Sequence, residues 1–127
     1  MKLIDTVLVA EMHGLASQSE RKRMNYDLRT TPEDQSQRML NVLEVGTVVP
    51  IHKHDDTSET VICLEGRLIE LLYEAVDGGF RETQRVELCP REGRFGVQIP
   101  KGAWHTIEVL EPSTIFEAKD GAFVPRS

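Results

Sequence analysis

The strongest structural signal in the chain is the segment Gly46-Thr-Val-Val-Pro-Ile-His52-Lys-His54-Asp-Asp-Thr-Ser-Glu59. His52 and His54 are two residues apart, so in a strand both imidazoles would point to the same face. The residues between His54 and Glu59 favour a turn, and the chain then resumes as the strand-like run Thr60-Val-Ile-Cys-Leu64. A strand, a turn and a second strand would therefore bring two imidazoles and the Glu59 carboxylate together.

A further imidazole comes from far along the chain. Pro100-Lys-Gly102 predicts a turn that leads into a strand, and His105 lies at the start of that strand. Trp104 precedes it and would point to the opposite side, as a packing or interface residue. Three imidazoles and one carboxylate suit a divalent transition metal such as Fe, Zn, Mn, Ni or Co, and the ligand set alone does not decide among them. We therefore predict one metal site, formed by His52, His54, Glu59 and His105.

These residues resemble the two sequence motifs of the cupins. The first motif is a glycine, five residues, His-x-His, three or four residues, Glu, six residues and a glycine, and it is matched from Gly46 to Gly66. The second motif is matched by Pro100, Gly102 and His105. The resemblance implies an all-β, single-domain double-stranded β-helix, the cupin jelly-roll barrel, here with an N-terminal helix.

The whole chain is also similar to the small cupin metalloproteins of the WbuC type. The similarity runs through Arg23-Met-Asn25, Gln37-Arg38 and the ending Phe116-Glu117-x-Lys119-x-Gly121. It implies a metal-dependent enzyme acting on a small polar substrate, such as a sugar or sugar nucleotide, in surface-polysaccharide metabolism. Isomerase, epimerase and oxygenase chemistry all stay open, and the alternative is a non-catalytic metal-dependent module that binds a sugar or carboxylate.

Candidate substrate-binding residues lie on the strand that precedes the first motif. The chain alternates from Gln35, with Arg38 on one face and Asn41 on the other, and the alternation does not show which face is inside. Arg38 is either solvated at the strand end or directed at the metal, where its guanidinium would grip an anionic group. A divalent ion with three neutral imidazoles and one carboxylate leaves a local charge of about +1, so we expect an anionic or oxygen-rich ligand. The WbuC resemblance adds three further candidates: Arg23, Asn25 and Glu117.

Composition places the protein among soluble globular domains. The chain has 127 residues, 39% of them hydrophobic and 28% charged, as expected of one domain. Its net charge of −6 argues against nucleic acid or an anionic membrane as a partner. No apolar run approaches the length of a membrane span, and we expect a cytoplasmic protein. We also predict a homodimer, because pairing would cover an exposed sheet edge.

The expected organisation is a helix over residues 6–19, a basic segment to residue 25, a barrel over 35–119 and a tail over 120–127. Asp5 or Thr6 can cap the helix. His13 lies within it with no partner ligand nearby in the sequence, which favours a half-buried helical residue over a metal ligand. Cys63 stands in an apolar run and is interpreted as a small buried hydrophobic residue.

Overall fold

The N-terminal helix, α1, spans Thr6–Gln18, as the sequence predicts. Asp5 is its N-cap, and the Asp5 carboxylate accepts a hydrogen bond of 3.0 Å from the backbone amide of Leu8. This bond satisfies one of the amides that the first turn of a helix leaves without a partner. Within residues 1–121, no helix is long and apolar enough to cross a membrane.

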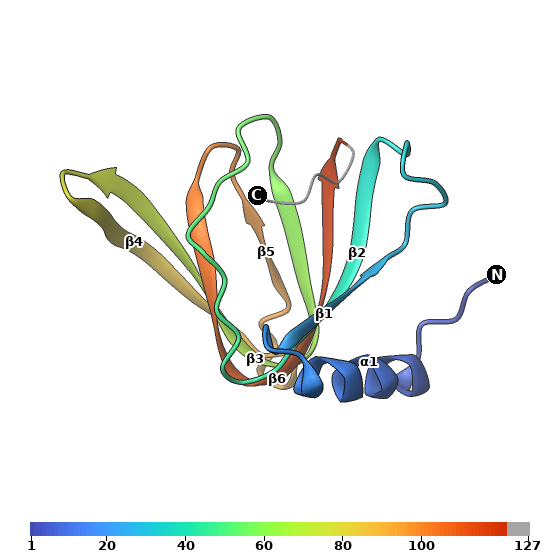
Figure 1. Ribbon diagram of the computed structural model, residues 1–127. Helices are drawn as coiled ribbons and strands as arrows, with labels where there is room; N and C mark the ends of the chain where they lie inside the picture. The colour runs from blue at the N-terminus through green and yellow to red at the C-terminus, as the bar shows by residue number, and fades with distance from the viewer. Residues whose placement is uncertain (122–127) are drawn as a thin grey trace.

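The computed structural model describes residues 1–121, so residues 122–127 of the predicted tail lie outside the described residues. The described strands pair antiparallel in the order β1-β2-β6-β3-β4, with β5 also paired to β3 (Figure 1). A short 3-10 helix, η1 (Pro90–Glu92), precedes β5. The strands are β1 (Arg23–Asp27), β2 (Ser36–Leu43), β3 (Glu59–Val76), β4 (Gly79–Leu88), β5 (Gly96–Ile99) and β6 (Trp104–Asp120).

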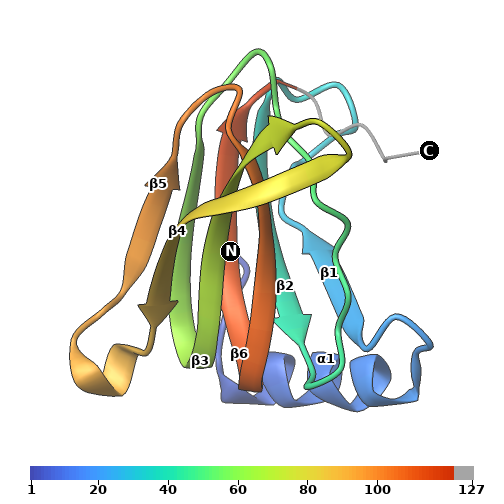
Figure 2. The same cartoon turned by 90° about the vertical axis from the view of Figure 1, so that its left-hand side faces the viewer.

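Two long strands, β3 and β6, build both walls of the barrel. They pair from Glu59 to Tyr73 on β3, and the register shifts between Cys63 and Leu68. Gly66 lies at this irregularity with φ +98°, and a Cβ there would meet the Pro112 carbonyl oxygen at 2.4 Å. β3 and β6 stay paired on both sides of the bend, and the two halves of the pair diverge as two walls, which Figures 1 and 2 show from two sides. The all-β cupin jelly roll with an N-terminal helix is thus confirmed.

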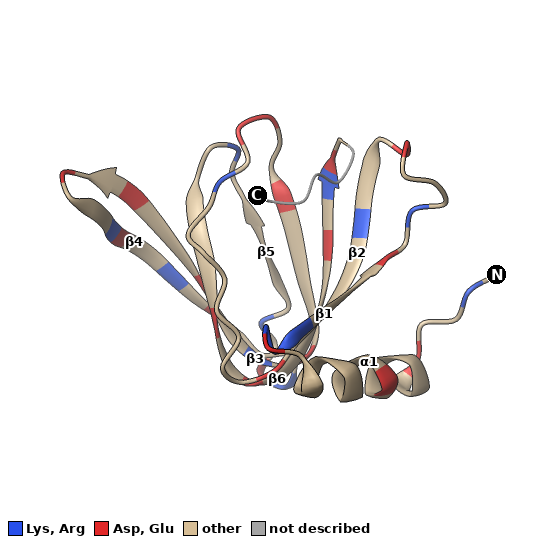
Figure 3. Ribbon diagram, in the orientation of Figure 1, with Lys and Arg blue, Asp and Glu red and all other residues tan. Residues whose placement is uncertain are grey.

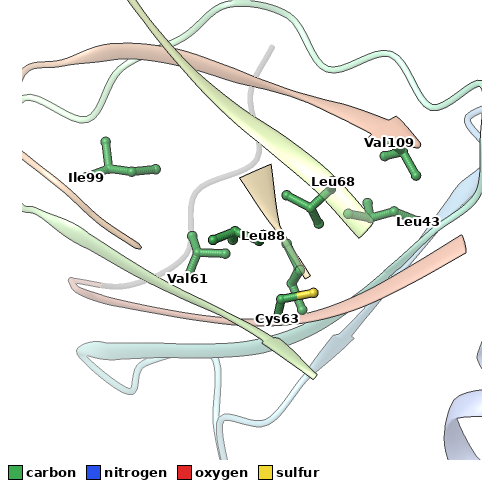
Figure 4. Packing of buried hydrophobic residues seen from close by; sticks show 8 residues of the cluster. Leu43, Val61, Cys63, Leu68, Leu88, Ile99 and Val109 are labelled. Atoms are coloured by element: carbon green, nitrogen blue, oxygen red, sulfur yellow. The ribbon is translucent and has the colours of Figure 1, made fainter. Parts of the chain in front are cut away.

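Buried apolar residues form two clusters on different sides of the sheet. Figure 4 shows the first, which packs between the walls near the bend and contains Leu43, Val61, Cys63, Leu68, Leu88, Ile99, Val109 and Ile115. In the second, Met12 and Ala16 of α1 pack on Leu40 and Val42 of β2. The outer face of β1 and β2 is therefore covered by α1 and is apolar, which leaves their inner face free to carry polar side chains.

The barrel begins earlier than residue 35. Arg23–Asp27, which the sequence assigns in part to a basic segment before the barrel, forms strand β1 and pairs with β2. Asn25 lies opposite Asn41 in this pairing. β1 is five residues long, and such a short strand gives little alternation to recognise in the sequence.

Both cysteines are buried and unpaired. Burial raises the pKa of the Cys63 thiol to about 11, so this thiol is protonated at neutral pH. Cys63 belongs to the first apolar cluster. Its interpretation as a small buried hydrophobic residue is confirmed.

Candidate metal centre and cavity

Three imidazoles converge on one point of the inner wall. The candidate ligand atoms of His52, His54 and His105 all lie within 4.8 Å of one another. His105 belongs to β6, whereas His52 and His54 lie on an extended segment that forms an isolated bridge with β6 rather than the expected regular strand. The His52 amide donates to the His105 carbonyl at 3.0 Å, and the His105 amide donates back at 2.8 Å. This backbone pairing fixes two of the three rings relative to each other.

Backbone carbonyls select the ring nitrogen that is available to a metal. The Nδ1 atom of His52 lies 2.8 Å from the Pro50 carbonyl oxygen, and that of His105 lies 2.9 Å from the Ala103 carbonyl oxygen. A carbonyl oxygen only accepts, so Nδ1 must carry the hydrogen in both rings. In a neutral imidazole the lone pair is then on Nε2, as a metal ligand requires. The chemistry of this donor set therefore fits a divalent transition metal.

Glu59 is placed beside the histidines at the start of β3. Its Oε2 atom lies 2.9 Å from Nε2 of His54, and its side chain is buried. Burial on its own would raise the pKa of the Glu59 carboxyl, but the hydrogen bond from His54 and the nearby imidazoles hold that pKa below its usual value. Glu59 is therefore an ionised carboxylate next to the cluster, available as the predicted fourth ligand.

A cavity of about 520 Å³ lies between the two walls and includes all four of these residues in its lining. Four of the five candidate substrate-binding residues of the sequence also line it: Arg23, Asn25, Asn41 and Glu117. Figure 3 shows a basic position on β1, and a basic and an acidic position near the end of β6. The structure thus brings four candidate substrate residues into the same space as the candidate metal ligands.

Arg38 lies outside this cavity. It shares the face of β2 that carries Leu40 and Val42, which α1 covers, and its guanidinium donates to the Ser36 carbonyl at 3.2 Å. A second contact, of 3.6 Å, joins it to Asp34. The structure therefore contradicts the interpretation in which Arg38 faces the metal and supports the one in which it is solvated at the strand end.

Glu70 is a cavity residue that sequence reasoning missed. Its side chain is only 4% exposed, and within the described residues its Oε2 atom has no hydrogen-bond partner. Burial, together with the negative charges of Glu59 and Glu117, raises the pKa of the Glu70 carboxyl well above its usual range. Leu68 and Leu72 stand two residues to either side, so the alternation of β3 was a signal that Glu70 points inward.

Trp104 and His13 lie away from the cavity, as the sequence predicts. The Trp104 ring packs on Phe80 with ring centroids 5.1 Å apart. His13 is a half-buried residue of α1, with Nδ1 2.7 Å from a carboxylate oxygen of Glu44 and Nε2 3.1 Å from the Thr114 hydroxyl. Its two ring nitrogens therefore join α1 to the sheet.

Several solved structures share the fold of this chain. TT1209 from Thermus thermophilus has a TM-score of 0.67 at 16% identity, covering 95% of this chain and 98% of that one. A cupin-2 domain containing protein from Shewanella frigidimarina has a TM-score of 0.54 at 23% identity, with 76% and 79% covered. CapF from Staphylococcus aureus, a capsular polysaccharide assembling protein, has a TM-score of 0.63 at 20% identity, with 84% and 30% covered. The fold is that of the cupins.

The family described as "Domain of unknown function (DUF6016)" matches residues 4–86, and the chain belongs to it. The match contains α1, β1, β2, β3 and part of β4, and with them His52, His54 and Glu59. No curated protein matches the chain.

Proposed function

We propose that the protein is a metal-dependent enzyme that acts on a small polar substrate, anionic or oxygen-rich, such as a sugar or sugar nucleotide of surface-polysaccharide metabolism. The observation that carries this proposal is the convergence of His52, His54 and His105 at the wall of a cavity of about 520 Å³. Glu59 is the fourth ligand. A divalent ion bound there would polarise a carbonyl or acidify a water molecule, and its open positions would accept substrate oxygens.

The charge of the cavity lining supports an anionic substrate. Four basic residues line the cavity together with three acidic ones (Arg21, Arg23, Lys53 and Lys119; Glu59, Glu70 and Glu117), although the protein as a whole carries a net charge of −6. Guanidinium groups form paired hydrogen bonds to carboxylate and phosphate. The similarity to CapF, which is described as a capsular polysaccharide assembling protein, supports the polysaccharide context. The two buried thiols are compatible with a reducing cytosol, which is where we place the protein.

The test of the metal site is metal stoichiometry, measured by elemental analysis on purified wild type and on His52→Ala, His54→Ala, Glu59→Ala and His105→Ala. We expect a near-stoichiometric transition metal in wild type and a loss of metal in the histidine variants. His13→Ala is the matched control, because this histidine bonds to Glu44 and Thr114 away from the cavity. Full metal retention with wild-type affinity in all four site variants would refute the assignment.

Turnover separates the enzyme from the non-catalytic binding module. The metal-loaded protein is incubated with sugar phosphates, sugar nucleotides and sugar acids, and products are followed by mass spectrometry and NMR. Metal-dependent conversion of one of them supports the enzyme. Thermal stabilisation by one of these compounds without conversion would instead favour the binding module.

A further inference from the structure

Polar residues lie among apolar ones on the inner barrel wall that β1, β2 and β6 form. Asn25 on β1 lies opposite Asn41 on β2, and Gln37 on β2 lies opposite Lys119 on β6. All four line the cavity, as does Glu117, which lies opposite Met39. Neither Gln37 nor Asn41 belongs to the histidine cluster. The candidate metal site therefore leaves this polar wall unexplained.

Two amide side chains of this wall are buried with an unsatisfied oxygen. Gln37 is 3% exposed and Asn41 is 7% exposed. Within residues 1–121, neither Gln37 Oε1 nor Asn41 Oδ1 has a hydrogen-bond partner. A buried acceptor without a donor destabilises the folded state, so such groups in proteins ordinarily have a partner. The two oxygens, both on the inward face of one strand, indicate that a donor arrives with a ligand.

The surrounding charges narrow the kind of donor. Lys119 lies directly opposite Gln37, and Arg23 lies on the neighbouring strand at the same wall. Next to Gln37 these cations disfavour an ammonium group as the donor, because like charges repel, and the carboxyl groups of Glu59, Glu70 and Glu117 lie elsewhere in the same lining. An amide presents both an acceptor and a donor, and a hydroxyl group can satisfy both at once. The wall is therefore suited to hydroxyl groups, and the nearby cations to an acidic group on the same molecule.

We infer that Gln37 and Asn41 form a hydroxyl-binding subsite on β2, which selects a polyhydroxylated acid, a sugar carboxylate or sugar phosphate, as the ligand of the metal-containing cavity. The inference rests on the proposed function and gives it a substrate class. The hydroxyl groups of this ligand would donate to the two amide oxygens. Its acidic group would be held by the metal ion and the cationic side chains.

The test compares sugar acids with acids of similar size that lack hydroxyl groups. The probes are D-glucuronate, D-galacturonate, D-gluconate and glucose 1-phosphate, with cyclohexanecarboxylate and cyclohexyl phosphate as hydroxyl-free counterparts. Binding to metal-loaded wild type is measured by titration calorimetry. We expect at least one sugar acid to bind at least tenfold more tightly than its hydroxyl-free counterpart. The carboxylate and phosphate pairs show which acidic group the cavity takes.

The variants Gln37→Met and Asn41→Leu replace the amides with apolar side chains of similar length. We expect each to weaken the sugar acid at least fivefold, to leave the affinity for the hydroxyl-free acid unchanged and to keep the metal content of wild type. Without ligand, each should be at least as stable as wild type, because the unsatisfied oxygen is gone. A structural amide would give the opposite result, a loss of thermal stability. Gln18→Met is the control, since Gln18 is exposed at the end of α1.

Besides a loss of thermal stability in the amide variants, three binding results would overturn the inference. They are equal affinity for sugar acids and hydroxyl-free acids, wild-type affinity for sugar acids in both amide variants, and no binding of any probe to metal-loaded wild type. None of them removes the metal site, which fails separately if the histidine variants retain metal.

Discussion

At His52 and His105, a backbone carbonyl fixes the side of the ring that can bind a metal. The sequence shows the spacing of the histidines, and their place on one cavity wall could be predicted from it. The hydrogen bonds that select Nε2 could not, because they depend on how Pro50 and Ala103 turn their carbonyls toward the rings. The residue types thus predict the ligand set, whereas the local backbone geometry determines which ring nitrogen is available to the metal.

Glu70 gives a prediction about pH. Its pKa is raised in the folded state, so as pH rises above the ordinary glutamate range the unfolded chain loses this proton while the folded protein keeps it. Folded-state stability therefore falls with rising pH, by at most about 1.4 kcal/mol per pH unit for one group. Glu70→Gln has no titrating group at this position, so its free energy of unfolding should not fall in this way. Urea denaturation should therefore show the variant's stability advantage over wild type growing from pH 5 to pH 7. With exposed Glu20→Gln as control, an advantage independent of pH would contradict this account.

A pair of arginine variants tests where the anion binds. Arg23 lines the cavity and Arg38 does not, so Arg23→Lys should weaken binding of an anionic ligand, by roughly tenfold if one paired hydrogen bond is lost. Arg38→Lys should leave that affinity unchanged. Calorimetry at matched metal loading measures both. The reverse pattern would place the anion on the other face of β2.

At the scale of elements, β2 shows why alternation alone could not orient the candidate residues. Leu40 and Val42 lie on one face, and Met39 and Leu43 on the other, so both faces carry apolar residues. The two faces differ because α1 covers the face that carries Leu40. The sequence predicts the helix and the strand separately, but tertiary packing decides which face of the strand the helix covers. For this reason the sequence permits two interpretations of Arg38.

The bend of β3 gives an element-scale prediction. At Gly66, φ is +98° and an added Cβ would lie 2.4 Å from both the Pro112 carbonyl oxygen and Ser113 Oγ. Gly66→Ala should therefore lower the free energy of unfolding by about 1–3 kcal/mol or more, through backbone strain and steric overlap. Gly14→Ala, within α1 with no atom near the added Cβ, should raise it by about 0.5–1 kcal/mol. Chemical denaturation measures both, and a tolerated Gly66→Ala would show that the bend accommodates a side chain.

At the scale of the whole molecule, we predict a homodimer. β4 has a neighbour on one side only in the described strand order, and its residues from Gly79 to Arg85 are exposed. An open strand edge presents unpaired backbone groups, which a second copy would cover. Light scattering should give twice the 14.4 kDa mass of one chain at micromolar concentration. A mass of 14.4 kDa at all micromolar concentrations would show a monomer, and the prediction would then be wrong.

The cluster formed by Met12, Ala16, Leu40 and Val42 has a consequence for how the protein folds. Because the inner wall of β1 and β2 mixes polar residues with Met39 and Leu43, collapse of the barrel interior supplies only part of the driving force for the assembly of these strands, and docking of α1 supplies the rest. Met12→Ala should thus slow folding if the docking occurs in the transition state, and mainly speed unfolding if it occurs later. Stopped-flow kinetics distinguishes the two orders.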